Sequence, residues 1–225
     1  MESEQAVRDN RVLPATRWAA LGIFVILVPA VIILWGAPGR TDDLWAWTIK
    51  PDLTPIFLGS GYAAGAYFFW QAFRAERWNV SYAGVFSAAA FAAVMLVATL
   101  LHWDKFNHGD APTLAAIAFY GWVGVYIVSP VLVFVLWYLN QRTDPRTPEP
   151  ADVVLPPRVL LGARLFGAAA ILSATVFFIS PQISIDLWPW TLTPLTARVL
   201  ASFTFQVGVG AVSYTHLTLP TKRIV

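Results

Sequence analysis

Residues 43–51 read Asp-Leu-Trp-Ala-Trp-Thr-Ile-Lys-Pro, and residues 186–194 read Asp-Leu-Trp-Pro-Trp-Thr-Leu-Thr-Pro. Six of the nine positions are identical at a constant spacing of 143 residues. A Leu-Thr pair follows each copy, and each copy lies between two long apolar segments. This repeated Trp phrase indicates a duplicated membrane unit with a Trp-rich loop at matching positions.

The composition predicts an integral membrane protein. Hydrophobic residues make up 57% of the 225 residues and charged residues only 12%, whereas soluble domains carry about 25% charged residues. A helix can cross a hydrocarbon core with roughly 17–25 apolar residues. Five apolar segments contain no Asp, Glu, Lys or Arg: residues 18–35, 56–73, 82–101, 114–139 and 165–185. A sixth apolar segment begins at Val199. Because a helix satisfies its own backbone hydrogen bonds in lipid, we predict an all-α, polytopic bundle with six transmembrane spans in a lipid bilayer.

Positive charge is distributed unevenly between the two sets of loops. The N-terminal tail and alternate loops contain nine Arg residues, whereas the other loops contain three basic residues, Arg40, Lys50 and Lys105. Positively charged loops stay in the cytoplasm, so we predict a cytoplasmic N-terminus and place both Trp phrases outside. The Ala-rich, Cys-free, Lys-poor composition favours a bacterial inner (cell) membrane. The formal charge of +2 predicts no nucleic-acid partner.

A Pro-rich stretch of mixed charge divides the chain into two units. We predict a cytoplasmic N-terminal tail at residues 1–17, a first four-helix unit at residues 18–139 and a cytoplasmic linker at residues 140–158. Residues 159–211 then begin a second unit. Because four spans is an even number, the two units have the same orientation, as in a parallel repeat.

The last residues resemble something other than protein-coding sequence. Residues 212–221 read Val-Ser-Tyr-Thr-His-Leu-Thr-Leu-Pro-Thr, which is the translation of GTC TCT TAT ACA CAT CTG ACG CTG CCG ACG, a string similar to a transposase-based sequencing adapter. We therefore interpret residues 212–225 as a non-native, adapter-derived tail that carries no information on the fold. The sixth span is then truncated, and we expect the intact protein to contain a parallel repeat of four plus four helices.

The two Trp phrases supply most of the candidate ligand-binding residues, which are Asp43, Trp45, Trp47, Asp186, Trp188 and Trp190. Trp gathers at membrane interfaces with its N–H toward water, so an interfacial belt is the simpler interpretation. The alternative is an aromatic-lined pocket at the outer face for an apolar or cationic ligand. The Asp of each phrase is also placed to cap a short helix through backbone N–H groups.

A third outer loop contains further candidates. His102 and Trp103 stand at the end of the third predicted span, and Asp104 and His108 follow them. Imidazole and carboxylate groups suit divalent metals, so His102, Asp104 and His108 form a candidate metal set. Their spacing matches no standard ligand pattern, and a solvated loop is the simpler interpretation. His102 is also a candidate pH-responsive group.

The sequence offers few groups for catalysis. It contains no nucleotide-binding loop, no Ser-x-x-Lys and no His-Glu-x-x-His, and without Cys it has no thiolate nucleophile. We therefore predict no catalytic residue and no cofactor. The first hypothesis is a protein that binds or passes a small uncharged or lipid-like solute at its outer face. The second is a structural or regulatory subunit whose Trp loops are interfacial anchors, and the third is a metal-dependent outer-face enzyme.

One short segment resembles a known family. Residues 45–55, Trp-Ala-Trp-Thr-Ile-Lys-Pro-Asp-Leu-Thr-Pro, are similar to the first loop of the tryptophan-rich sensory (translocator) proteins. Those small five-helix membrane proteins carry Lys-Pro-x-Trp-x-Pro-Pro before their second helix. Here Leu53 stands in place of that Trp, and a single Pro follows. The duplication and the Pro-rich linker depart from that family, so we assign the chain to none.

Overall fold

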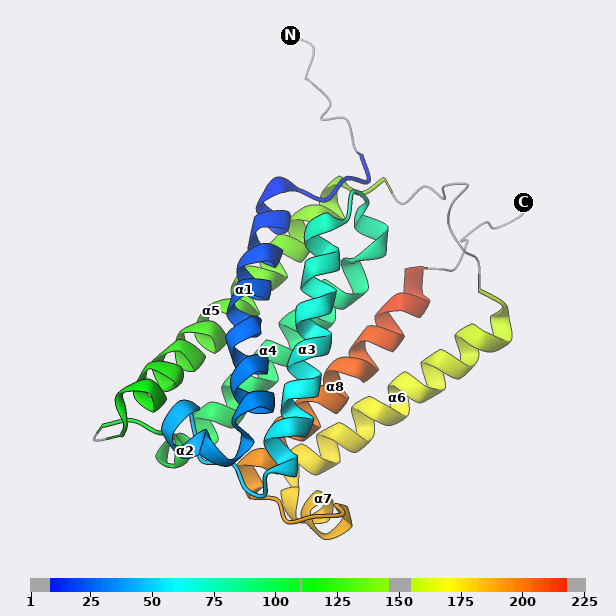
Figure 1. The fold of residues 1–225 in the computed structure, drawn as a ribbon. Helices are drawn as coiled ribbons and strands as arrows, with labels where there is room; N and C mark the ends of the chain where they lie inside the picture. The colour runs from blue at the N-terminus through cyan, green and yellow to red at the C-terminus, as the bar shows by residue number, and fades with distance from the viewer. Residues whose placement is uncertain (1–8, 110, 146–154, 218–225) are drawn as a thin grey trace, which may run out of the picture.

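The computed structural model describes residues 9–109, 111–145 and 155–217, and this part of the chain is all-helical (Figure 1). Within these residues, five helices are long and apolar enough to cross a membrane: α1 (Pro14–Gly36), α4 (Tyr82–Leu101), α5 (Thr113–Thr143), α6 (Pro157–Ile179) and α8 (Pro194–Leu217). The remaining long helix, α3 (Leu53–Arg74), has 22 residues but a lower hydropathy. The prediction of an apolar, all-α chain is confirmed, with five candidate membrane helices.

Short helical elements connect the long helices. The short α-helices are α2 (Thr41–Leu44) and α7 (Pro181–Leu187), and the single 3-10 turns are η1 (Pro38–Arg40), η2 (Trp78–Val80) and η3 (Trp103–Lys105). Much of the predicted linker and of the two predicted tails lies outside the described residues, namely residues 1–8, 146–154 and 218–225.

Proline determines several helix ends. α1 begins at Pro14, four residues before the predicted span, because Pro has a suitable fixed φ and its missing N–H is not needed at the first helical position. The sequence predicted a single span over residues 165–185, but α6 ends at Ile179 and α7 starts at Pro181. That prediction was wrong because Pro181 disfavours a helical Ser180 and provides no N–H to continue the helix.

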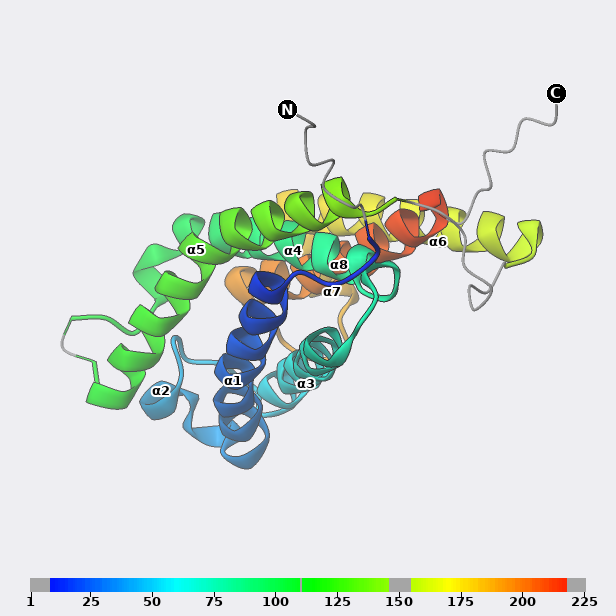
Figure 2. The ribbon, with the colours of Figure 1, turned by 90° about the horizontal axis from the view of Figure 1, so that it is seen from above.

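The long helices form a row with a helix pair packed on one side. α5, α4, α8 and α6 lie side by side in that order, and the pair α1 and α3 covers one face of the row (Figure 2). The start of α1, the connection from α3 to α4, the end of α5 and the start of α6 lie at one end, the terminal end (Figure 1). The opposite end carries α2, α7 and both Trp phrases and is the loop end.

A buried amide joins α1 to α5 at the terminal end. The side chain of Asn140 is fully buried and accepts a hydrogen bond from the backbone N–H of Leu13 at 2.9 Å. Its Nδ2 donates to the hydroxyl of Thr16 and to the carbonyl of Leu136, so the amide uses both donors and its acceptor. Buried polar groups are stable only when paired in this way, and the start of α1 is thereby fixed to the last turns of α5.

Two glycines allow α6 and α8 to pack with their backbones in close contact. A Cβ added at Gly208 on α8 would lie 2.8 Å from the carbonyl oxygen of Gly167 and 2.9 Å from the backbone nitrogen of Ile171, both on α6. Backbone atoms cannot move aside as a flexible side chain can, so these positions require glycine. Small residues have this role wherever membrane helices approach closely.

We expect Gly208→Ala to destabilise the protein by about 1–3 kcal/mol, because the added methyl group forces α6 and α8 apart. The measurement is the thermal unfolding of the purified protein in detergent. Gly162→Ala on α6 is the matched control, since a Cβ there meets no atom within 4 Å and alanine favours helix over glycine. Equal stability of the two variants would contradict the packing assigned to Gly208.

Candidate ligand-binding cavity

The first Trp phrase lies in the protein core. Trp45 is 6% exposed and Trp47 is 1% exposed. Trp47 packs edge-to-face on Trp122 of α5 with ring centroids 4.8 Å apart, and on Phe106 at 5.4 Å. The interpretation of these two side chains as an interfacial belt was wrong, because Trp122 of α5 packs on both rings, Tyr62 of α3 packs on Trp45 and Phe106 packs on Trp47.

Hydrogen bonds fold the first Trp phrase inward. The hydroxyl of Thr41 accepts from the backbone N–H of Ile49 at 2.9 Å and closes the loop between them. Trp47 and Phe106 form an isolated antiparallel bridge. Asn107 donates its backbone N–H to the carbonyl of Ala46 at 2.7 Å. Two loops distant in the sequence thus satisfy each other's backbone groups, which allows this segment to be buried.

The second Trp phrase is only partly buried and packs on the start of α3. Trp188 and Trp190 are half-buried and contact Phe57 with ring centroids 5.6 and 6.3 Å away. The indole N–H of Trp190 donates to the hydroxyl of Thr54 at 2.9 Å. Because Thr54 lies three residues after the first Trp phrase, this bond joins the second phrase to the segment that follows the first one.

The two aspartates do not cap helices. Asp43 lies inside α2 and forms an exposed ion pair with Arg40 at 3.4 Å, and an exposed pair of this kind contributes roughly 0–1 kcal/mol. Asp186 lies inside α7 and accepts a hydrogen bond from Gln182 at 2.5 Å. Neither carboxylate lines the main cavity described below.

The third outer loop separates the candidate metal ligands. His102 contacts Arg198, Asp104 pairs with Lys105 at 2.7 Å, and His108 packs on Phe119 with ring centroids 5.3 Å apart. Trp103 also packs on Phe119, at 5.1 Å. Among the described residues no group of three or more His, Cys, Asp or Glu side chains is placed to hold a metal ion, so the candidate set does not form a centre there.

Arg198 connects three helices at the loop end. Its Nε donates to the carbonyl of Phe178 in the last turn of α6 at 2.9 Å, and its Nη1 lies 2.8 Å from Nε2 of His102, which follows α4. A guanidinium has donors only, so Nε2 of His102 accepts and the imidazole is neutral. Burial lowers the pKa of His102, and the charges of Arg198 and Lys105 lower it further against an opposing attraction from Asp104.

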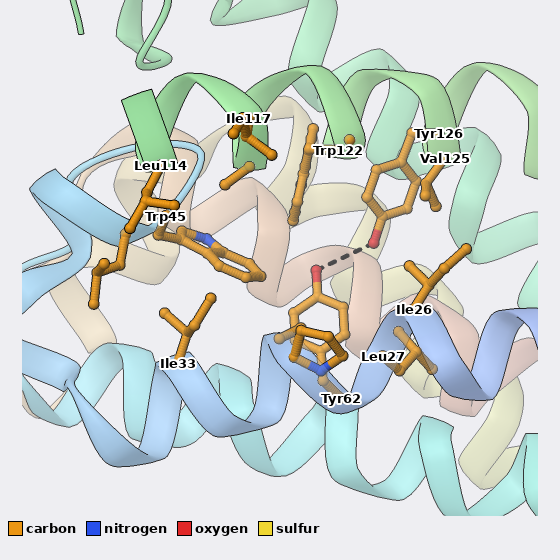
Figure 3. A pocket seen from close by; sticks show the side chains of 15 residues that line it. Ile26, Leu27, Ile33, Trp45, Tyr62, Leu114, Ile117, Trp122, Val125 and Tyr126 are labelled. Atoms are coloured by element: carbon orange, nitrogen blue, oxygen red, sulfur yellow. Dashed lines mark hydrogen bonds between the residues drawn. The ribbon is translucent and has the colours of Figure 1, made fainter. Parts of the chain in front are cut away.

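A cavity of about 350 Å³ lies between α1 and α5 in the half of the bundle nearest the loop end. α1 contributes Ile26, Leu27, Pro29, Ala30 and Ile33, and α5 contributes Leu114, Ile117, Ala118, Gly121, Trp122, Val125 and Tyr126. Figure 3 shows Trp45 at one end of this space and Tyr62 of α3 at its floor. Of the predicted site residues, only Trp45 lines the cavity.

The cavity wall is apolar and aromatic, with few polar atoms. The hydroxyls of Tyr62 and Tyr126 point toward each other and lie 3.1 Å apart (Figure 3). The indole N–H of Trp122 donates to Thr99 at 2.9 Å, whereas that of Trp45 is buried with no partner among the described residues. Among the residues that the structure describes, no charged side chain lines the cavity. Such a space suits an uncharged apolar molecule of modest size.

Sequence reasoning missed the α1 and α5 residues that form this cavity. These residues belong to uniformly apolar segments. In such segments the residues that face lipid and the residues that face a cavity have the same composition. A Cβ added at Gly121 would meet no atom within 4 Å, so its missing side chain leaves open space. Among the cavity-lining residues of these spans, Pro29 and Gly121 depart from the uniform apolar pattern. Neither residue indicates which other helix forms the opposite wall of the cavity.

The chain matches no protein-family model, no curated protein and no solved structure. The functional assignment therefore rests on the geometry of the cavity and its lining.

We expect the free energy of unfolding to decrease as the pH falls below about 6.5, the ordinary pKa of histidine. A lowered pKa in the folded protein means that the unfolded chain binds the proton more readily, so folding loses stability as the pH falls from that value toward the folded pKa of His102. Protonation also removes the acceptor for Arg198. The measurement is the thermal midpoint in detergent between about pH 5 and pH 7.5.

His102→Gln retains a side-chain acceptor but does not titrate, so the dependence on pH should become flatter in this variant. His108→Gln is the control, because His108 packs on Phe119 and does not contact Arg198. A pH profile that His102→Gln leaves unchanged, or that His108→Gln flattens equally, would refute the role given to the contact between His102 and Arg198.

Proposed function

We propose that this membrane protein binds a small, uncharged, lipid-like molecule in the cavity between α1 and α5. The observation that carries the proposal is an aromatic, apolar cavity of about 350 Å³ without a charged lining residue. Burial of an unpaired charge there has a large energetic cost, which favours an uncharged occupant. Cavities of roughly 300–1,000 Å³ are typical of small-molecule sites, so this one suits a compact ring or a short apolar chain.

The exposed side chains around the cavity favour entry from the bilayer. Ile26 on α1 is 52% exposed, and Leu114 and Ile117 on α5 are 59% and 61% exposed. These residues line the cavity and also face outward, so its rim is apolar. α1 and α5 lie apart at the loop end, as the view in Figure 2 illustrates. A hydrophobic solute dissolved in lipid can therefore reach the space without crossing water.

The membrane placement that we propose includes α3 as a sixth span. α3 packs along α1 (Figure 1), so both helices occupy the same depth, and its lower hydropathy reflects Gly, Ser and Gln residues on a helix with protein neighbours. Trp18 and Trp35 are exposed near the two ends of α1. They are 17 residues apart in the sequence, which corresponds to about 26 Å along a helix and suits indoles at two interfaces.

Helix positions support the proposal of a parallel internal repeat. α1 and α6 each have 23 residues and begin at Pro14 and Pro157, which have the same 143-residue spacing as the Trp phrases. Equivalent bonds also join the next helix in each unit. Trp35 of α1 donates to the carbonyl of Ile56 on α3 at 3.0 Å, and Arg198 of α8 donates to the carbonyl of Phe178 on α6 at 2.9 Å.

The alternative of a ligand-free subunit anchored by its Trp loops loses most of its support. Its main observation was the pair of Trp phrases, and Trp45 and Trp47 are both buried in the core. The exposed indoles that suit an interface are instead those of Trp18, Trp35 and Trp103. An enzyme that uses His102, Asp104 and His108 has no support from their separated positions.

We expect Gly121→Phe to weaken binding of a brominated alkane by about tenfold or more, because the phenyl ring occupies the cavity. Bromine quenches indole fluorescence on contact, and Trp45 and Trp122 line the space. The measurement is saturable fluorescence quenching of the purified protein in detergent. A brominated alkanoate and an alkyltrimethylammonium ion test the preference for an uncharged ligand, and both should bind more weakly.

Gly124→Phe is the matched control for this variant. Gly124 and Gly121 are both exposed on α5, and a Cβ at either meets no atom within 4 Å, but only Gly121 lines the cavity. Quenching that never saturates, or that both variants reduce equally, would contradict binding in this cavity. Tighter binding of the ammonium ion would contradict the choice of an uncharged ligand.

We expect Asp186→Cys to react with a membrane-impermeant maleimide in intact cells, and Asp9→Cys to react only after permeabilisation. The reason is the excess of arginine in the N-terminal tail and alternate loops. The chain has no cysteine, so each introduced thiol is the only one. The reverse labelling pattern would invert the proposed orientation, and labelling of both sites in intact cells would contradict a membrane boundary between them.

A further inference from the structure

The tyrosine pair at the cavity floor has one more donor than it can use. Tyr62 is 4% exposed and Tyr126 is 5% exposed. Each phenol carries one O–H, and within the pair only one of the two protons can lie between the oxygens, which are 3.1 Å apart. In the described part of the chain neither hydroxyl has another partner. One phenolic O–H therefore has no acceptor.

A second unused donor belongs to a residue of the cavity wall. The indole N–H of Trp45 is buried without a partner among the described residues, whereas that of Trp122 is satisfied by Thr99. The Trp45 nitrogen is covered by protein atoms, so the surplus donor available to a ligand is the one of the tyrosine pair. Buried donors without partners are rare in folded proteins, while acceptors with an unused lone pair are tolerated more often.

From this donor surplus we infer that the ligand carries an uncharged carbonyl oxygen, as a ketone, ester or quinone does. This inference rests on the proposed binding function and specifies its chemistry. A carbonyl oxygen has two lone pairs and no proton, so it accepts from the tyrosine pair and adds no further donor. The apolar remainder of the ligand lies against the side chains of α1 and α5 and extends toward the lipid.

The tyrosine pair has a specific consequence for mutagenesis. If Tyr62 or Tyr126 alone is replaced by Phe, the remaining phenol loses its partner but keeps an O–H that can donate to the ligand. Only the double variant removes this donor from the floor of the cavity. Replacing both members of a hydrogen-bonded pair with apolar groups of similar shape leaves stability nearly unchanged, so the double variant should fold.

The experiment compares three probes with the same bromoalkyl chain. One ends in a methyl ketone and has only an acceptor, one ends in an alkylpyrrole and has only an N–H donor, and one is the plain bromoalkane. Binding is measured by saturable Trp quenching of the full chain in detergent. We expect the wild-type protein to bind the ketone about two- to tenfold more tightly than the other two probes.

The variants test whether the tyrosine pair causes this preference. Each single Phe variant should keep the preference for the ketone, and Tyr62→Phe/Tyr126→Phe should bind ketone and alkane more nearly equally. Tyr120→Phe is the control, because Tyr120 is 65% exposed on α5 and does not line the cavity. If the double variant fails to fold, the comparison of the three probes on the wild-type protein still decides the inference.

Each outcome has a distinct meaning. Equal binding of ketone and alkane by the wild-type protein, or tighter binding of the pyrrole, would overturn the inference but leave the cavity as an apolar site. Absence of saturable binding by any probe would instead overturn the proposed function. Ketone binding is then measured in nanodiscs of ester phospholipid and of ether phospholipid to identify the source of the carbonyl. If an ester group of the lipid occupies the cavity, ketone binding is weaker in the ester lipid than in the ether lipid.

Discussion

The packing of Trp45 and Trp47 against α5 is the contact on which the rest of the loop end depends. Trp45 and Trp47 lie edge-to-face on Trp122 at 5.8 and 4.8 Å, and each such pair adds about 0.5–1.5 kcal/mol beyond the burial of its surface. The Trp47 ring lies between α5 and Phe106 of the loop after α4, and the Trp45 ring lies between α5 and Tyr62 of α3. Trp45 lines the cavity between α1 and α5 at this end, while Asn140 joins the same helices at the opposite end.

The two Trp phrases show that neighbouring segments determine how deeply two similar local sequences are buried. The first copy is covered by α5 and by the segment around Phe106, so its indoles are buried. The second copy packs at the edge of the core on the start of α3, where Trp190 bonds to Thr54 and both rings contact Phe57, and its indoles are half-buried. In the parallel repeat that we propose, the bond from Trp35 to Ile56 and the bond from Arg198 to Phe178 lie at corresponding places and use different side chains.

The cavity combines an apolar wall with the surplus hydroxyl donor of the tyrosine pair. Within a bilayer, apolar burial alone gives little selectivity, because lipid tails are as apolar as the lining. In the binding function that we propose, the tyrosine pair supplies the directional component, and the uncharged lining favours neutral ligands. The contact between Arg198 and His102 lies outside this space and stabilises the junction of α4, α6 and α8.

The sequence by itself determined the helical class and the position of nearly every long helix, because apolar runs of sufficient length must form helices in lipid. Tyr82–Leu101 was predicted to the residue, and the error at residues 165–185 came from Pro181. The similarity of the two Trp phrases was also visible in the sequence. Only the tertiary structure decided that Trp45 and Trp47 are buried, that His102 bonds to Arg198, and that Tyr62 meets Tyr126 beside a cavity. These features depend on contacts across 64 to 96 residues, and local composition carries no record of which helices become neighbours.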